Sequence, residues 1–362
     1  MKLKRKRFVA CLITASVGVV LAFLLWPWSP ELYRATILPS LGGRYSAVHA
    51  VNDRGQVVGV TELADGSRRL FLWDRDNGTE DLGPVTGDQL AINNAGHIAG
   101  TMSDRNGHQA FFWELGKGRT MLGTLGGDMS LALAINNRSQ IVGVSSNAAD
   151  APRLFLWDKA TGIKELDRPE ARGCWPEGID DRGRVLVAGV SKGATRRYLL
   201  RPEGPVLLKE VPPDASRVSL NSDGSMAATV EVGHADPYLA LWRRGEPMKR
   251  LASISAHTQM TKLNERNQVA WTSFRPRRWE KWRERLRGPR LMREESVSYL
   301  WDPARGKIPL DRYVGDVERF YVVGLNNHGS IIGNLCTKDG QQHAALLEPI
   351  PERWGDKGPA SD

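Results

Sequence analysis

A ten-residue phrase recurs along the chain, and it constrains the possible folds more than any other feature. It has the form Ala-Ile-Asn-Asn-x-Gly-x-Ile-x-Gly, and its copies begin at Ala50, Ala91, Ala134, Gly178, Ser219, Lys262 and Gly324. The third residue of each copy, called the anchor below, is Asn52, Asn93, Asn136, Asp180, Asn221, Asn264 or Asn326. Successive anchors lie 41, 43, 44, 41, 43 and 62 residues apart. Such a period indicates a repeat architecture in which each unit packs on its neighbours.

Each unit reads as four short strands, a to d. Strand a ends at the anchor, strand b follows a tight turn, and strand c is an apolar run that ends in Trp73, Trp113, Trp157, Trp242 or Trp301. Arg201 and Leu347 take the Trp position in units four and seven. Four short strands per unit, separated by turn residues, are typical of a propeller blade. We therefore predict an all-β, seven-bladed β-propeller, with six or eight blades as the alternatives.

The residue two places before each anchor is small in every copy except the sixth, where it is Lys262. Innermost strands crowd around the axis of a propeller, so small side chains fit there. The pattern identifies strand a as the inner strand of each blade.

The seventh unit ends without a convincing fourth strand. The segment Ile37 to Gly43 (ILPSLGG) resembles Met121 to Gly127 (MLGTLGG), which lies at strand d of unit two. We expect residues 33–41 to supply the missing outer strand and to close the ring, which removes an exposed sheet edge. The predicted propeller spans residues 33–348, with a C-terminal tail at 349–362.

Residues 1–30 predict a membrane anchor. Five basic residues between Lys2 and Arg7 precede Phe8 to Trp28, a run of 21 residues without charge. A helix of that length spans about 30 Å, the thickness of a bilayer core. The basic flank places the N-terminus in the cytoplasm, so we expect a single-pass protein of the cell membrane with its propeller in the periplasm or extracellular space. A cleaved signal peptide is the alternative.

The net charge of +9 is concentrated in two places. The N-terminal flank supplies five positive charges, and residues 275–295 hold nine Arg or Lys against four Glu. The remainder is close to neutral, which together with export argues against a nucleic-acid partner. Cys174 and Cys336 fall in different units, so no disulfide framework is expected.

No catalytic, cofactor-binding or metal-binding motif is recognisable. The anchors suit turns, because Asn and Asp bond their own backbone there. The segment Asp74 to Asp81 has the alternating acids of a calcium loop, but it also falls where a turn between strands c and d is needed. We predict no catalytic residue, no cofactor and no metal. The alternative is a site assembled from residues of distant blades, which the sequence does not exclude.

An insertion at residues 275–295 separates strands b and c of unit six. Trp279, Trp282 and Leu286 share one face of a short helix, and Arg278, Lys281 and Arg285 lie on its flanks and opposite face. Such an element suits anionic lipid or an acidic partner. The alternative is a solvated loop whose two Trp residues pack on the neighbouring blade.

The insertion rises from the face that also carries the connections between strands d and a. Candidate binding residues on this face, just ahead of strand a, are Arg44, Asp88, Asp128, Trp175, Arg217, His257 and Asp316. The mixture of Arg, acid, Trp and His suits a polar ligand or a protein surface.

The phrases AINNAGHIAG from Ala91, HQAFFW from His108 and LGTLGG from Leu122 resemble the HAF-repeat proteins, a group of exported bacterial repeat proteins. The resemblance covers residues 33 to about 348. It is strong in units one to three, moderate in unit seven and degraded in units four to six. It implies a propeller-like repeat and export, and it carries over no catalytic residue.

Together these features predict a membrane-anchored, outward-facing propeller that acts as a binding scaffold for a protein or glycan. The alternatives are a hydrolase or lyase acting on an envelope polymer in the central funnel, which requires carboxylates or His with Arg around the axis, and a purely structural role in the envelope.

Overall fold

The computed structural model describes residues 31–87, 89–104, 107–167, 169–231, 236–255, 258–276, 294–315 and 317–354. The chain divides into two units, one formed by residues 34–349 and the other by residues 1–33 with 350–362. The larger unit holds the repeats.

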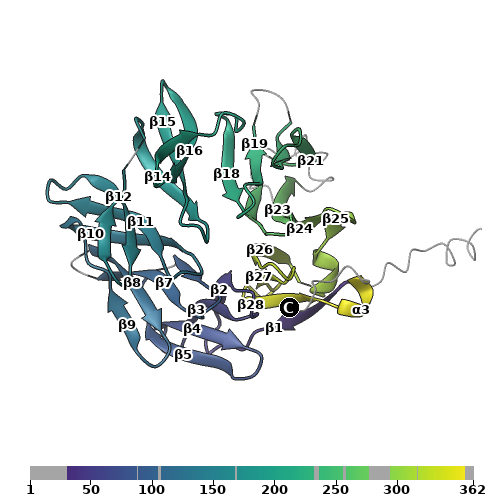
Figure 1. Ribbon diagram of the computed structural model, residues 1–362. Helices are drawn as coiled ribbons and strands as arrows, with labels where there is room; N and C mark the ends of the chain where they lie inside the picture. Colours follow the sequence, from purple (N-terminus) through teal and green to yellow (C-terminus); the bar gives the residue numbers. More distant parts are fainter. Residues whose placement is uncertain are drawn as a thin grey trace, which may run out of the picture. The chain divides into compact units, whose positions relative to one another are not determined.

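Seven four-stranded sheets form the blades within the described residues, which confirms the seven-bladed β-propeller (Figure 1). Blade 1 consists of β2 (Ser46–Val51), β3 (Val57–Glu62), β4 (Arg68–Asp74) and β5 (Gly78–Pro84). Blade 2 consists of β6 (Leu90–Ile92), β7 (Ile98–Asp104), β8 (Gly107–Glu114) and β9 (Gly118–Met121). Blade 3 consists of β10 (Gly126–Ile135), β11 (Ile141–Asn147), β12 (Pro152–Asp158) and β13 (Gly162–Glu165).

Blade 4 consists of β14 (Arg172–Ile179), β15 (Val185–Ser191), β16 (Ala194–Arg201) and β17 (Gly204–Leu207). Blade 5 consists of β18 (Ala215–Leu220), β19 (Met226–Val230), β20 (Tyr238–Trp242) and β21 (Lys249–Ser253). Blade 6 consists of β22 (Gln259–Leu263), β23 (Val269–Pro276), β24 (Glu294–Asp302) and β25 (Gly306–Pro309), followed by a 3-10 turn, η1 (Asp311–Tyr313). In each of these blades the strands follow one another in chain order.

Blade 7 has the strand order β1-β28-β27-β26, in which β1 (Tyr33–Ile37) comes from the other end of the chain. The other strands are β26 (Arg319–Leu325), β27 (Ile331–Cys336) and β28 (Gln342–Pro349). Just past β1, the Leu38 N–H donates to the Ala344 carbonyl at 2.9 Å. An N-terminal segment therefore lies at the outer position of the last sheet.

Glycine in strand b makes room for an aromatic ring from strand c of the same blade. A Cβ on Gly59 would lie 2.6 Å from the Phe71 ring, and one on Gly143 would lie 2.6 Å from the Phe155 ring. Both Phe side chains are fully buried. Interiors packed at crystal-like density leave no room for an added methyl group, so the final glycine is required in the copies whose strand c places a Phe ring against it.

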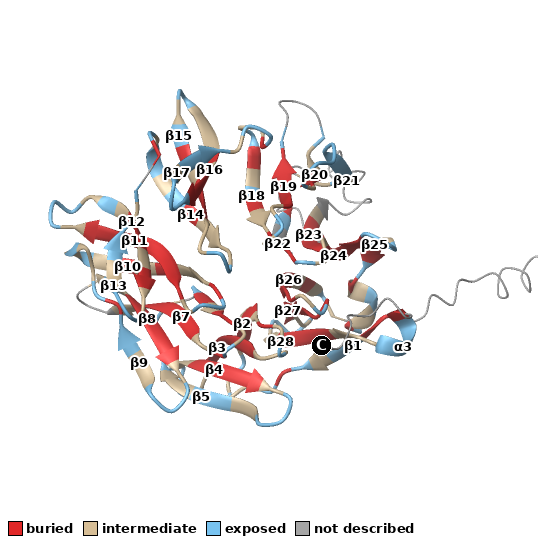
Figure 2. Cartoon of the chain, in the orientation of Figure 1, coloured by how far each residue is buried: buried red, intermediate tan, exposed pale blue. Residues whose placement is uncertain are grey.

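The strand-c tryptophans pack against the preceding blade. Trp113 belongs to an apolar cluster with Leu70 and Leu72 of blade 1, and the Trp157 ring lies 5.1 Å from that of Phe112 in blade 2. Burial is concentrated in the central strands of each blade, as Figure 2 shows. The repeated Trp therefore seals junctions between blades.

In the smaller unit the described residues are 31–33 and 350–354. The Leu32 carbonyl accepts hydrogen bonds from the Ile350 N–H and from the Trp354 indole N–H, both at 2.9 Å. The Tyr33 and Trp354 rings meet edge to face at 5.6 Å, and α3 spans Pro351–Trp354. No helix within the described residues has the length and apolar character to cross a bilayer. Residues 1–30, where the anchor is predicted, lie outside this part of the chain.

Candidate functional site

The side-chain amides of the anchors link each blade to the next. Asn52 donates to the carbonyl of Asn93 at 2.9 Å, and Asn93 donates to that of Asn136 at 3.0 Å. The remaining links join Asn136 to Asp180, Asn221 to Asn264, Asn264 to Asn326 and Asn326 to Asn52. The last link returns to blade 1. The Asn anchors are buried, so their amides need hydrogen-bond partners within the protein. The carbonyl groups of the neighbouring anchors supply these partners.

A second series of hydrogen bonds runs beside the first and uses the residue after each anchor. The Asp53 N–H donates to Oδ1 of Asn94 at 2.9 Å, and the Asn94 N–H donates to Oδ1 of Asn137 at 2.8 Å. The pattern continues from Asn137 to Asp181, Ser222 to Glu265, Glu265 to Asn327 and Asn327 to Asp53. The second Asn of the phrase is therefore an acceptor for the preceding blade.

Among the described residues both series are interrupted at one junction, between blades 4 and 5. Asp180 has no amide to donate. Arg184 crosses the junction instead: its Nε donates to Oδ2 of Asp180 at 2.5 Å and its Nη2 donates to the Ser222 carbonyl at 3.0 Å. Buried Arg197 also crosses, because it pairs with Glu177 at 3.1 Å and donates to the Ala215 carbonyl. Arginines replace asparagine at this junction.

A cleft of about 560 Å³ opens at the same junction. Its lining includes five arginines, Arg182, Arg184, Arg201, Arg243 and Arg244, and three acids, Glu210, Asp223 and Glu246. Apolar side chains such as Leu199, Leu208 and Met226 also line it. The volume lies within the roughly 300–1,000 Å³ typical of ligand sites.

A smaller cavity of about 280 Å³ lies between blades 3 and 4. Leu156 and Leu166 of blade 3 line it, together with Leu200 and Arg201 of blade 4. Arg201 stands where five other units carry the sealing Trp. Its side chain is exposed, so no indole fills the space at this junction. Arg201 thus faces both the cavity and the cleft.

The inner strands of six blades line a central cavity of about 300 Å³. Its charged and titratable side chains are His49, Glu177, Asp180, Arg184 and Lys262. Lys262 lines this cavity, and its side chain remains accessible to water there. The surrounding strands reduce the hydration of its ammonium group, and this desolvation lowers the pKa of Lys262. Arg184 lines both the central cavity and the cleft.

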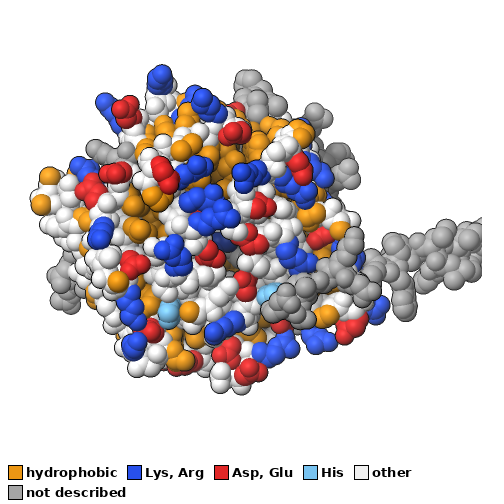
Figure 3. Space-filling view, viewed as in Figure 1, with side chains coloured by type: hydrophobic (Ala, Val, Ile, Leu, Met, Phe, Trp, Pro, Cys, Tyr) orange, Lys and Arg blue, Asp and Glu red, His pale blue; other side chains and the backbone are white. Residues whose placement is uncertain are grey.

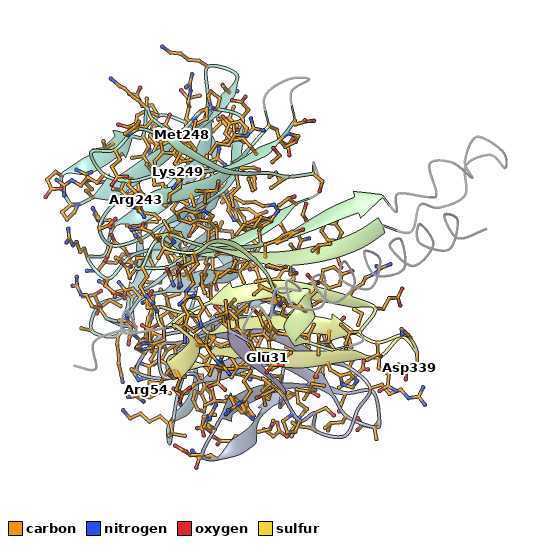
Figure 4. The ribbon with its side chains drawn as sticks, turned by 90° about the vertical axis from the view of Figure 1, so that its right-hand side faces the viewer. Glu31, Arg54, Arg243, Met248, Lys249 and Asp339 are labelled. Atoms are coloured by element: carbon orange, nitrogen blue, oxygen red, sulfur yellow. The ribbon has the colours of Figure 1, made fainter. Side chains whose placement is uncertain are left out.

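The cleft opens on the face that carries the a–b and c–d turns, called the turn face below. Figure 3 shows Lys and Arg side chains gathered near the middle of this face, close to the inner ends of β14 and β18. Figure 4 shows Arg54 and Arg243 on this side and Asp339, in the connection between β27 and β28, on the opposite side. The opposite side, called the loop face, carries the b–c and d–a connections.

The predicted binding residues of the loop face are distributed over separate blades. Arg44 precedes β2, Asp128 lies in β10, Trp175 in β14 and Arg217 in β18, and all four are exposed. Each lies at a different blade, and no hydrogen bond or ion pair in the described part of the chain joins them. Arg217 has a φ of +53° and occupies a bulge in β18. Asp88, His257 and Asp316 lie outside the described residues.

The predicted insertion lies where blade 6 has its b–c connection. β23 and β24 pair in register as far as Pro276 and Glu294. Residues 277–293 follow Pro276 in the sequence and lie outside the described residues. At the base of this hairpin the Phe274 ring lies 5.8 Å from the Tyr321 ring of blade 7. Trp279, Trp282, Arg278, Lys281 and Arg285 lie outside the described residues.

The predicted alternative of a calcium loop at Asp74 to Asp81 falls on the turn between β4 and β5. Oδ1 of Asp74 accepts hydrogen bonds from the backbone N–H groups of Asp76 and Asn77 at 3.0 and 2.6 Å. These bonds lower the pKa of Asp74, with the Asn77 side chain making the largest contribution. The carboxylate is thus used in the turn. Within the described chain, no group of three or more His, Cys, Asp or Glu is placed to hold a metal ion.

No family model and no curated protein sequence matches this chain. Solved structures are similar to it in fold. An acylaminoacyl peptidase from Pyrococcus horikoshii aligns at a TM-score of 0.56 and 11% identity over 84% of this chain and 52% of that chain. A puromycin hydrolase aligns at 0.55 and 14% over 85% and 52%, and U3-55K at 0.53 and 14% over 88% and 98%.

The chain spans about half the length of the peptidase and the hydrolase. At these identities the likeness shows the fold alone: the chain is a β-propeller.

Proposed function

We propose that this chain is a binding propeller, a scaffold that holds a protein or a glycan. The observation that carries the proposal is the recessed, arginine-lined cleft at the one junction where both hydrogen-bond series are interrupted. Among the described residues the anchor bonds link the blades at the other junctions, and the cleft holds arginines without hydrogen-bond partners. This arrangement has the form of a rigid support with a preformed site.

The proposal includes the loop face as a second contact surface, on which the insertion meets its partner through Trp279 and Trp282 or through Arg278, Lys281 and Arg285. It also places residues 1–30 in the membrane, assigns β1 to closing the ring, and puts the propeller outside the cytoplasm. The support is the basic and apolar N-terminal sequence and the place of residues 277–293 at the b–c edge of blade 6.

The test is a crosslinking capture from membranes with three chains: the full chain, one in which an Asn-Gly turn replaces residues 277–293, and one with Arg182→Gln and Arg201→Gln. The turn replacement keeps the paired strands through Pro276 and Glu294. We expect a partner that is retained by the full chain and lost with one of the two variants. A chain that retains no partner in any form contradicts the proposal.

The central cavity supports a second candidate, an enzyme acting on a polymer. Glu177, Asp180 and Lys262 converge there with His49 and Arg184, and a cluster of acids with His or Arg around the axis is what such chemistry requires. Hydrolysis of an envelope polysaccharide or peptide that disappears in Lys262→Met and in Glu177→Gln would favour this candidate over the scaffold.

A further inference from the structure

The cleft between blades 4 and 5 holds more positive than negative side chains, five guanidinium groups against three carboxylates. Two of these arginines have partners inside the protein. Arg184 is bonded to Asp180 and Ser222, and Nη1 of Arg243 lies 3.7 Å from Glu246. The net charge of the cleft lining is therefore positive in the absence of a ligand.

Several donors in the cleft are left unused by the protein. Nε of Arg243 is buried without a hydrogen-bond partner in the described structure. The guanidinium groups of Arg182, Arg201 and Arg244 are exposed, and no described residue hydrogen-bonds to them. A buried donor without an acceptor costs free energy, which an oxyanion in the cleft would recover. Guanidinium groups match carboxylates in two parallel hydrogen bonds, so carboxylate is the complementary chemistry.

Exposed apolar side chains lie beside these arginines. Val206 and Leu207 are 41% and 37% exposed on β17, and they directly precede Leu208 of the cleft lining. Val206 pairs with Leu199, another lining residue. On the blade 5 side, Met248 is 44% exposed just beyond Glu246. Arginine and methionine are enriched in protein interfaces, and exposed apolar groups beside them add surface that a bound segment can bury.

We propose that this cleft binds an acidic peptide segment of a partner protein, one in which Asp or Glu alternates with aliphatic residues. The inference rests on the proposed binding function and names its partner class. Trp242, the aromatic side chain in the lining, is 9% exposed, so the cleft lacks the open aromatic platform on which sugar rings stack. The aliphatic rim instead suits side chains of a peptide.

The test is fluorescence anisotropy with the purified full chain and a labelled peptide that alternates Glu with Leu. We expect saturable binding that weakens as NaCl is raised, because charge pairing contributes to it. Replacing both Arg182→Gln and Arg201→Gln weakens the peptide Kd at least about tenfold. A peptide with Gln in place of Glu, and one with Lys in place of Glu, bind no better than buffer controls.

Arg54→Gln is the matched control. Arg54 lies two residues after the anchor of blade 1, as Arg182 lies two residues after that of blade 4, and it is exposed on the turn face (Figure 4). The control binds the peptide as the unaltered chain does. Urea unfolding of each variant verifies folding, and Arg244→Gln supplies an independent substitution on blade 5.

Equal weakening by Arg54→Gln, or peptide binding unaffected by the cleft substitutions, overturns the inference. An oligogalacturonate that binds through Arg182 and Arg201 when the peptide does not also overturns it, while leaving a binding propeller in place. If neither probe binds and the membrane capture above retains no partner, the proposed function fails with it.

Discussion

Ser139 accepts a hydrogen bond from the side-chain amide of Asn93, the anchor of the preceding blade, at 3.1 Å. Ser139 has a φ of +61°, at the turn position where five other copies carry glycine and the sixth copy carries Asn267. A residue with a side chain is strained in this left-handed region, and the bond to Asn93 offsets the strain. The residue four places after each anchor explains why Ser139 accepts this hydrogen bond.

Where the residue four places after the anchor is Gln, its side-chain oxygen accepts the second amide hydrogen of the anchor in the same blade. Asn52 donates to Gln56 at 2.8 Å, and Asn136 donates to Gln140 at 3.0 Å. The next blade then has glycine in its turn, and a Cβ on Gly183 would come within 3.2 Å of the Gln140 oxygen. Blade 2 has His97 at this position instead of Gln, so the second amide hydrogen of Asn93 is donated to Ser139 of blade 3. Gln with Gly and His with Ser are alternative solutions at equivalent junctions.

The first prediction concerns this exchange. His97→Gln and Ser139→Gly should each destabilise the propeller by about 1 kcal/mol, because each removes one side of the 2.7 Å bond between His97 Nδ1 and Ser139 Oγ. The double variant recreates the Gln–Gly junction and should recover at least about 1 kcal/mol. Urea unfolding of the four chains measures the coupling. Effects that simply add, within about 0.5 kcal/mol, would contradict the exchange.

The second prediction concerns the anchors. Asn264→Ala removes bonds to the Asn326 carbonyl and to Gln268, at 2.9 and 2.8 Å, and leaves the backbone N–H groups of Arg266 and Gln268 without their acceptor. We expect a loss of about 2–4 kcal/mol in the free energy of unfolding, since these groups are buried or half-buried. Asp65→Ala, in an exposed turn, is the control. A loss below about 1 kcal/mol would show that the junction does not depend on the amide.

The third prediction concerns the cavity between blades 3 and 4. Arg201→Trp supplies the indole that five other units carry at this position and should stabilise the propeller by about 0.5–2 kcal/mol, as cavity-filling substitutions do. Differential scanning calorimetry gives the change in Tm. A lower Tm would mean that the cavity cannot accept the indole without strain.

The fourth prediction concerns pH. Enclosure lowers the pKa of Lys262 below its ordinary value of 10.5. Between the two pKa values the unfolded chain binds more protons than the folded one, so stability rises with pH there, and the full penalty of the charged amine is present below the folded pKa. Lys262→Met should therefore stabilise the propeller most at pH values below the folded pKa of Lys262, and the gain should shrink as pH rises from there towards 10.5. Urea midpoints of both chains across this range measure it, and a gain that does not change with pH would contradict the assignment.

The periodic phrase was sufficient to predict the blades, because each copy carries its own turn, inner strand and apolar strand. It also identified Lys262 and Arg201 as departures from the pattern. The anchors were interpreted as local turn residues, which is correct for their side-chain oxygens. Their amides reach the next blade, and a bond between Asn52 and Asn93 has no signature in either copy alone.

The arginine-lined cleft was not predicted, because its residues come from turns and strands of two units that look merely degraded in the sequence. The signal was present in unit four, where Asp180, Arg184 and Arg201 replace Asn, Gln and Trp. Three departures at junction-forming positions of one unit indicate an altered junction. Recognising this requires knowing that these positions face the neighbouring blade, which the structure supplies.

The interrupted junction between blades 4 and 5 also gives this ring a seam. A ring with the same hydrogen bonds at every junction has no preferred place to open. In this ring, Arg184 and Arg197 replace the paired asparagine bonds at one junction. Opening of the native ring should begin there, so amide hydrogens of β14 and β18 exchange before those of β2 and β6. New chain ends introduced at the seam, between Leu208 and Asp214, should be tolerated better than ends at any other junction, because in the described chain the paired asparagine bonds of the other junctions are missing there.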